Sequence, residues 1–287
     1  MSSKSKNLVI VGAGHLGCRV AQLWRESYPE ARIVLKTRSF NEKRATLWSS
    51  LGYIPVSSKD PGEAEKSDCV IFCAPPTGND NYPDDVHQAL QDHWTGSAQG
   101  GFVFTSSGGV LAENGGGVVN EASEIKHSPY NDKILEAEKH TLDNEGCVIR
   151  LGGLYEQNRG AHNYWLTVKD AYPSAPNGLI NLIHYQDAAL CVIRILERQI
   201  RSRLFLASDG QPISRSGICQ AARLNPDYSD KSLPRFEGQE DLIDGKKYVT
   251  ARLQSELDWK PLFPDFKTFM ADMYQNVQPC DLLAGLK

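Results

Sequence analysis

The stretch NLVIVGAGHLGCRVAQLW, Asn7 to Trp24, decides the fold class of this 287-residue chain. It begins with a run of apolar, mainly β-branched residues, Leu8 to Val11, which is typical of a buried parallel strand. The glycine pattern Gly12-x-Gly14-x-x-Gly17 follows at once and leads into a segment whose apolar residues have helical spacing. This strand, glycine turn and helix predict the first unit of a nucleotide-binding α/β fold.

Each glycine of this turn has its own steric role. Gly12 permits the tight turn, Gly14 lets the main chain approach a pyrophosphate, and Gly17 lets the helix lie close to the strand. The pyrophosphate would meet the free N–H groups and the positive dipole end of the helix, beside His15 and Leu16. We therefore expect this turn to bind a dinucleotide. The alternative is a glycine turn that binds no ligand.

The end of the second predicted strand indicates which dinucleotide binds. Ile33 to Leu35 are apolar and mainly β-branched, which is typical of a strand, and Lys36 follows them. An NAD enzyme places an acidic residue here, about 20 residues after the glycines, on the ribose 2′-hydroxyl. This sequence has Thr37, Arg38 and Ser39 instead, and a guanidinium with hydroxyls binds a 2′-phosphate through charge-assisted hydrogen bonds. NADP(H) is therefore favoured over NAD(H), the alternative being that Arg38 is a solvated loop cation.

Strands and helices continue to alternate along the chain. SDCVIFCAPP, GGFVFTSSGGV and GCVIRLGGLY each contain an apolar strand followed by small or polar residues. Such alternation predicts an α/β fold with a Rossmann-type, doubly wound parallel sheet and right-handed crossovers. The ligand crevice of such a sheet lies beyond the carboxyl ends of its strands. We expect it to contain Ala74, Pro75 and Pro76 after the third strand, and Ser106 and Ser107 at the end of the fourth.

Composition and charge exclude several classes of protein. With 40% hydrophobic and 23% charged residues the chain is globular, and no apolar run approaches the roughly 20 residues that span a bilayer. The polar lead MSSKSK lacks the features of a secretory signal, and a net charge of −4 argues against a nucleic-acid surface. Most of the seven cysteines lie in apolar segments of the sequence, so we expect them to be buried free thiols and we expect no metal site. Free thiols also favour a cytoplasmic or organelle-stromal protein.

A family resemblance covers nearly the full chain. The sequence is similar to extended or atypical short-chain dehydrogenase/reductases of the NAD-dependent epimerase/dehydratase type, near their YeeZ-like branch. The text that carries the resemblance is VGAGHLG, KTRS, FCAPP, FTSSGGV, VIRLGGLYEQNRG, NLIHYQDAA and the C-terminal GKKYVTARLQSELDWKPLFPDFKTFM. The last piece departs from the family pattern at Thr250, where asparagine is usual, and at Asp258, where glycine is usual.

The resemblance implies an arrangement of domains and a catalytic serine. It implies a cofactor-binding Rossmann core, residues 1–151 plus 181–198, and a smaller C-terminal substrate region, residues 152–180 plus 202–287. Ser107 stands where relatives carry the serine or threonine that orients a substrate hydroxyl or carbonyl, although Leu111 replaces the tyrosine usual nearby. The residues alone also allow a plain turn whose hydroxyls bond the main chain.

The segment SPYNDKILEAEK, residues 128–139, departs from the family at a critical position. Redox members carry Tyr-x-x-x-Lys, in which the tyrosine is the general acid/base and the lysine lowers its pKa and holds the nicotinamide ribose. Here Tyr130 is followed at the third position by Lys133 and at the fourth by Ile134. Adjacent positions of a helix differ by about 100° around its axis, so Lys133 points to another side of the helix than a lysine at position 134 would. Either an irregular first turn lets Lys133 reach the ribose, or another residue substitutes, or the protein only binds the cofactor.

The sequence therefore predicts an NADP(H)-binding oxidoreductase or epimerase that acts on a small polar or sugar-linked substrate. Ser107 would orient the reacting oxygen and Tyr130 would exchange its proton. The alternative is a catalytically degenerate NADPH sensor or scaffold. Arg159 lies on a loop expected to face the substrate. It is expected to pair either with a phosphate or carboxylate of the substrate or with a carboxylate on the protein surface. Asp187 is expected to cap a helix. The sequence is compatible with a homodimer and does not require one.

Overall fold

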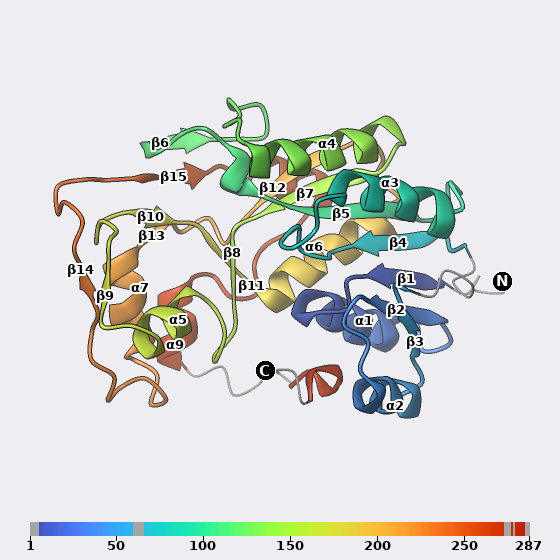
Figure 1. The fold of residues 1–287 in the computed structure, drawn as a ribbon, viewed down its shortest axis with the longest axis horizontal. Coiled ribbons are helices and arrows are strands. Elements are labelled where there is room, and N and C mark those ends of the chain that lie inside the picture. Colours follow the sequence, from blue (N-terminus) through green and yellow to red (C-terminus); the bar gives the residue numbers. More distant parts are fainter. Residues whose placement is uncertain (1–5, 60–65, 273–276, 278, 285–287) are drawn as a thin grey trace.

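A seven-stranded parallel sheet forms the centre of the computed structural model, which describes residues 6–59, 66–272, 277 and 279–284 (Figure 1). Its strand order is β12-β7-β5-β4-β1-β2-β3. The strands are β1 (Leu8–Val11), β2 (Ile33–Thr37), β3 (Ile54–Ser57), β4 (Cys69–Phe72), β5 (Gly101–Ser107), β7 (Cys147–Leu151) and β12 (Leu204–Ala207). The chain moves from β1 to one edge and then returns to fill the other side, so the order reverses between β1 and β4. The predicted Rossmann-type doubly wound sheet is confirmed.

Helices cover both faces of this sheet (Figure 1). The helices α1 (His15–Ser27) and α6 (Tyr185–Glu197) pack together on one face, and α3 (Tyr82–His93) and α4 (Pro129–Asp143) on the other. Side chains of β1 alternate between the two layers, with Leu8 and Ile10 in the α1 and α6 core and Val9 and Val11 in the opposite core. Burial on both faces explains why the strands are continuous apolar runs.

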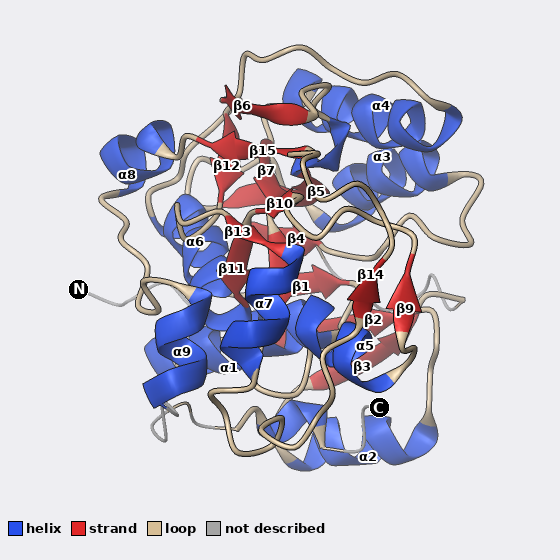
Figure 2. Ribbon diagram, turned by 90° about the vertical axis from the view of Figure 1, so that its left-hand side faces the viewer, coloured by secondary structure: helices blue, strands red, loops and turns tan. Residues whose placement is uncertain are grey.

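A second group of elements lies beside the large sheet, at one end of the molecule (Figures 1 and 2). A four-stranded sheet has the order β13-β10-β15-β6, and two further pairs are β11 with β8 and β14 with β9. These strands are β6 (Gly115–Val119), β8 (Gly153–Tyr155), β9 (Ala171–Tyr172), β10 (Leu179–Ile180), β11 (Leu182–His184), β13 (Ile213–Ser214), β14 (Arg235–Phe236) and β15 (Gly245–Tyr248). The remaining helices are α2 (Glu42–Ser50), α5 (Ala161–Thr167), α7 (Arg215–Ala222), α8 (Ala251–Leu257) and α9 (Phe266–Asp272), with short 3₁₀ turns η1 (Gly108–Val110) and η2 (Asp281–Leu283).

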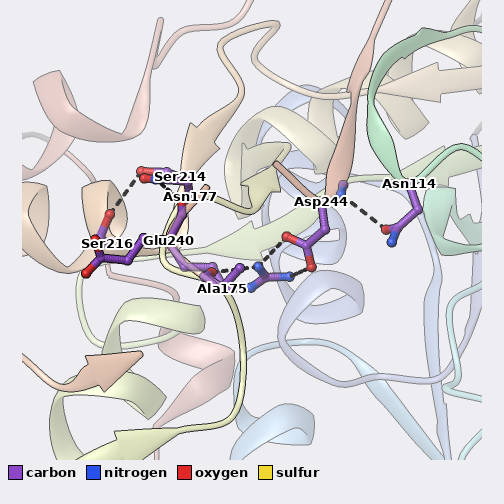
Figure 3. Close-up of polar contacts among 9 residues, drawn as sticks. Asn114, Ala175, Asn177, Ser214, Ser216, Glu240 and Asp244 are labelled. Atoms are coloured by element: carbon purple, nitrogen blue, oxygen red, sulfur yellow. Dashed lines mark hydrogen bonds and ion pairs between the residues drawn. The ribbon is translucent and has the colours of Figure 1, made fainter. Parts of the chain in front are cut away.

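Polar contacts fasten the stretch before β15 to this second group (Figure 3). Arg215 at the start of α7 binds Asp244 through two hydrogen bonds, of 2.6 and 3.0 Å, and donates a third to the Ala175 carbonyl. The Asn177 amide donates to the Glu240 carbonyl at 2.7 Å. The guanidinium is planar and meets the carboxylate with two parallel bonds, which fixes the direction of the chain as it enters β15.

One side-chain role differs from the sequence expectation. Asp187 does not cap α6; its carboxylate accepts hydrogen bonds from the main-chain N–H groups of Leu262 and Phe263, at 2.8 and 3.1 Å. The cap is His184, whose ring nitrogen accepts from the N–H of Gln186. Asp187 thus ties α6 to the C-terminal segment. The cysteines are free thiols as predicted, and six of the seven are buried. Among the described residues, no helix combines the length and apolar character that a bilayer crossing requires.

Candidate functional site

The glycine turn between β1 and α1 has a geometry that only glycine can adopt at two positions. Gly12 has a φ of +102°, and a Cβ there would lie 2.2 Å from the main-chain nitrogen of Ala74. A Cβ on Gly17 would lie 2.7 Å from the Gly12 carbonyl oxygen. A Cβ on Gly14 would instead have its nearest neighbour 4.0 Å away. Gly12 and Gly17 are therefore needed for the fold, and Gly14 leaves the main chain open to a ligand.

Two cavities meet at this turn. The serine cavity, of about 410 Å³, reaches towards the ends of β5 and α4 and contains Ser107 and Tyr130. The arginine cavity, of about 450 Å³, reaches towards the end of β2 and contains Arg38 and Arg44. The lining that the two cavities share is Gly12, Gly14, Cys73, Ala74 and Pro75. Together the cavities form an elongated, two-lobed space with the glycine turn in the middle.

The predicted site residues distribute between these cavities with one exception. The serine cavity is lined by His15, Leu16, Gly17, Pro76, Ser106, Ser107 and Tyr130 in addition to the shared residues. The arginine cavity is lined by Thr37, Arg38 and Ser39. Lys133 lines neither cavity. The carboxyl ends of neighbouring parallel strands meet at one edge of the sheet, which explains why residues far apart in the sequence gather here.

Two guanidinium groups lie in the arginine cavity. Arg38, after β2, donates to the carbonyl oxygens of Thr77 and Gly78 at 3.3 and 3.5 Å. Arg44, from α2, donates to the Ala13 carbonyl at 3.0 Å and stacks 4.6 Å from the Trp48 ring centroid. Sequence reasoning missed Arg44, because the cue it used was the residue that follows the second strand. A basic side chain in the first turn of the next helix is a signal that could have found it.

The ammonium group of Lys36 also lines the arginine cavity. Its Nζ lies 2.9 Å from Nε2 of His93, and burial lowers the pKa of this lysine. Two carboxylates of α3, Asp85 and Asp92, line the same cavity and act in the opposite direction on that pKa. The cavity therefore combines cations at the β2 edge with acids on α3.

The two serines at the end of β5 have different surroundings. Ser107 is exposed, and its Oγ accepts a hydrogen bond from the N–H of Gly109 at 3.1 Å. Its hydroxyl donates to no acceptor among the residues that the structure describes, so its proton is available to the cavity. Ser106 is buried, and its Oγ donates to Glu138 at 2.5 Å. Glu138 is bound in turn by Arg150 through contacts of 2.9 and 2.6 Å. Ser106 thus lines the cavity while its hydroxyl serves a buried ionic network.

Helix α4 presents Tyr130 to the serine cavity but turns Lys133 elsewhere. The helix begins at Pro129, and Ser128 caps it by accepting a hydrogen bond from the N–H of Asn131. Tyr130 is 51% exposed and lines the cavity beside Ile134, which is 4% exposed. The Nζ of Lys133 donates to the Asn79 carbonyl at 3.2 Å. In the structure described, an isoleucine occupies the position that the motif lysine would hold.

A third group of polar side chains completes the serine cavity. Arg159, from the loop after β8, donates from Nε to the hydroxyl of Tyr185 at 3.0 Å. The rings of Tyr185 and His15 lie 5.9 Å apart. Burial lowers the pKa of His15 and the charge of Arg159 lowers it further, whereas burial raises the pKa of Tyr185. Tyr185 was missed in the sequence, where its signal is its place directly after His184 in the IHxxD turn.

The fold and the site together define a Rossmann-fold protein with a two-lobed crevice at its glycine turn. No protein-family model matches the sequence, and no curated protein matches it. Solved structures do share the fold. A functionally unknown conserved protein from Silicibacter pomeroyi has a TM-score of 0.75 at 14% identity, over 96% of this chain and 100% of that chain.

Two enzymes with the same fold carry functional names. The dTDP-glucose 4,6-dehydratase from Bacillus anthracis, in complex with NAD, has a TM-score of 0.72 at 15% identity, over 96% of this chain and 98% of its own. The UDP-Glc/GlcNAc 4-epimerase from Campylobacter jejuni has a TM-score of 0.72 at 16% identity, over 95% of this chain and 98% of its own. At these identities the likeness establishes the shared fold.

Proposed function

We propose that this protein binds NADP(H) and acts as an oxidoreductase or epimerase on a small polar or sugar-linked substrate, in the manner of the epimerase/dehydratase type of short-chain dehydrogenase/reductase. The observation that carries the proposal is the glycine turn shared by two cavities, one with guanidinium groups and one with Ser107 and Tyr130. The dehydratase with the same fold was solved in complex with NAD. A place within the YeeZ-like branch is part of this proposal and rests on the sequence motifs alone.

The preference for a 2′-phosphate rests on charge at the end of β2. Arg38 and Arg44 both line the arginine cavity, and β2 ends in Thr37 with no carboxylate in the residues that follow it directly. An acidic side chain there would repel a phosphate and bind a ribose diol. Two guanidinium groups can instead share the phosphate oxygens through charge-assisted hydrogen bonds. The glycine turn would meet the diphosphate with the N–H groups of α1.

The chemistry in the serine cavity follows from Ser107 and Tyr130. When bound, the nicotinamide supplies hydride transfer. Ser107 donates a hydrogen bond from its hydroxyl to a substrate oxygen and so orients this reacting oxygen. Tyr130 exchanges a proton with that oxygen. Phenols act as bases near neutral pH only where a cation stabilises their anion, and Ile134 stands in the lysine's position. This substitution favours the second candidate, a cofactor sensor or scaffold without turnover.

The predicted division of the chain belongs to the same proposal. We propose a cofactor core of residues 1–151 plus 181–198 and a substrate-side region of residues 152–180 plus 202–287. The strand β12 (Leu204–Ala207) falls within residues 202–287 but pairs with β7, so it extends the large sheet of the cofactor core. Free and mostly buried thiols are in keeping with the proposed cytoplasmic or organelle-stromal location.

Titration of NADPH and NADH into the purified protein tests the cofactor. We expect NADPH to bind more tightly than NADH. Arg38→Ala should weaken NADPH binding by about 10- to 100-fold, the worth of lost charge-assisted hydrogen bonds, and leave NADH binding unchanged. Lys43→Ala is the matched control, because Lys43 is an exposed cation beside Arg44 that lines neither cavity. Equal binding of both nucleotides by the wild type would contradict the proposal.

A screen of carbonyl compounds and sugar nucleotides separates the enzyme from the sensor. Oxidation of bound NADPH by any of them, lost in Ser107→Ala while NADPH still binds, would support the enzyme. Tight NADPH binding without turnover, accompanied by a change in protease sensitivity of the protein, would favour the sensor.

A further inference from the structure

The serine cavity also contains a cluster of side chains that has no role in the proposed proton and hydride transfer. We call His15, Arg159 and Tyr185 the Arg159 cluster; all three line the cavity. Arg159 is held by a tight turn in which the main-chain groups of Glu156 and Arg159 bond each other, at 2.8 and 3.3 Å. The cluster is therefore built from three separate elements, the glycine turn, the loop after β8 and the start of α6.

The cluster offers more hydrogen-bond donors than the protein uses. An arginine side chain has five N–H donors, and Arg159 spends one, from Nε, on the Tyr185 hydroxyl. Its two terminal amino groups make no hydrogen bond to any residue that the structure describes. Tyr185 accepts in that bond, so its own proton has no acceptor among the described residues either. A guanidinium fork and a hydroxyl thus face the same space.

The charge of Arg159 is also uncompensated inside the cavity. Among the described residues, those that line the serine cavity include no carboxylate and no second cation apart from titratable His15. The Glu156 carboxylate, whose charge acts on the pKa of both His15 and Tyr185, is already paired with buried Arg19 at 2.8 Å. A cavity wall with one unbalanced guanidinium favours an anion, and a planar fork matches the two oxygens of a carboxylate or phosphate.

We propose that the Arg159 cluster binds an anionic group of the substrate, a carboxylate or a phosphate, and so restricts the substrate to small acids or phosphorylated compounds. The terminal amino groups of Arg159 hold two oxygens of the anion, and Tyr185 and His15 each donate one hydrogen bond. The reacting oxygen then lies at Ser107 and Tyr130, which line the same cavity. This inference rests on the proposed function, since it names the substrate class of the same cavity.

Protonation of His15 provides a reporter inside the cluster. Its pKa is lowered by burial first and by Arg159 second, with smaller contributions from Arg44 and Arg19, while Glu156 acts in the opposite direction. A bound anion would cancel the effect of Arg159 and raise this pKa. Because His15 also belongs to the glycine turn, the diphosphate of the cofactor could produce the same shift. The test must therefore distinguish an anion of the substrate from that of the cofactor.

Malonate and inorganic phosphate serve as probes on the full chain with NADPH saturating. We expect calorimetry to detect binding to the wild type, a loss of about ten-fold or more in Arg159→Met, and a smaller loss in Arg159→Lys, which keeps the charge without the fork. Arg235→Met, at an exposed arginine of β14, is the matched control and should bind as the wild type does. NADPH affinity should change by less than about two-fold in Arg159→Met. NMR titration of His15 should show a pKa rise on malonate addition that Arg159→Met abolishes.

Two results would overturn the inference. One is the absence of malonate and phosphate binding to the NADPH complex up to about 20 mM. The other is an Arg159→Met variant that loses NADPH affinity as Arg38→Ala does and still binds the probes, which would assign the cluster to the cofactor diphosphate. If the wild type binds no NADPH, the proposed function fails by itself. An Arg159-dependent His15 shift in the cofactor-free protein would then still support the anion subsite, and its absence would refute it.

Discussion

The side-chain amine of Lys133 donates a hydrogen bond to the main-chain carbonyl oxygen of Asn79, 3.2 Å away, on the loop between β4 and α3. It also lies 3.9 Å from the Asp80 carboxylate. Tyr130, three residues earlier, lines the serine cavity, and the residue beside it there is Ile134. The tyrosine and the nearest lysine of α4 therefore face different parts of the molecule.

Ile134→Lys should supply the missing cation. A lysine at this position enters the serine cavity beside Tyr130 and stabilises the phenolate. We expect one tyrosine to ionise at lower pH in ultraviolet difference titrations, and turnover of any substrate found in the screen to rise by about ten-fold or more. Lys133→Met is the control and should leave both readouts unchanged. Loss of turnover in Lys133→Met would show that Lys133 reaches the site when cofactor binds.

Gly14→Ala and Gly12→Ala should separate binding from folding. An alanine at position 14 has room for its Cβ, so this variant should keep the wild-type melting temperature and lose about ten-fold or more in NADPH affinity, because the methyl group stands where the diphosphate approaches. An alanine at position 12 meets the Ala74 nitrogen and is strained at positive φ. It should lower the free energy of unfolding by more than about 3 kcal/mol. Thermal melts followed by NADPH titration measure both; a destabilised Gly14→Ala would contradict the assignment.

Glu138→Gln should destabilise the protein strongly. Glu138 and Arg150 are 3% and 4% exposed and joined by two hydrogen bonds, so the variant leaves a buried guanidinium without its counter-charge. We expect the free energy of unfolding to fall by about 3–5 kcal/mol in urea titrations. Lys139→Ala, which breaks the neighbouring exposed pair with Asp143, should cost no more than about 0.5 kcal/mol. Similar losses in the two variants would show that the buried network contributes little.

Asp209→Asn should remove a pH dependence of stability. Burial raises the pKa of Asp209 from 3.8 to about 7, and Asp265 and Asp187 nearby add to the effect. Between about pH 4 and pH 7 the folded state therefore keeps a proton on Asp209 that the unfolded state loses. The contribution of this group to the stability of the protein is greatest below about pH 4 and falls as the pH rises to about 7. The variant keeps an acceptor for the Gln211 N–H. It should be more stable than the wild type at pH 8, by about 4 kcal/mol, and no more stable at pH 4. If Asp209→Asn and the wild type differ in stability by the same amount at pH 4 and pH 8, the raised pKa is contradicted.

The nucleotide-binding half of the fold could be predicted from the sequence because its signals are local. A strand of four apolar residues, a glycine turn and an amphipathic helix lie within one short stretch, and each is set by sterics and burial of neighbouring residues. The alternation of such units then implies a parallel sheet, whose carboxyl edge gathers Arg38, Ala74 and Ser107. The sequence therefore determined the class of fold, and it indicated that the glycine turn and the residues after β2, β4 and β5 line the cavities.

The direction of individual side chains was decided only by the tertiary structure. Ser106 and Ser107 are adjacent and alike in sequence, yet one bonds Glu138 in the interior and the other faces the cavity. Lys133 turns to Asn79 because of where the loop after β4 passes, and Tyr185 meets Arg159 across 26 positions of sequence. Hydrogen bonds and ion pairs act over a few ångströms between segments that only packing brings together, so no local pattern encodes them.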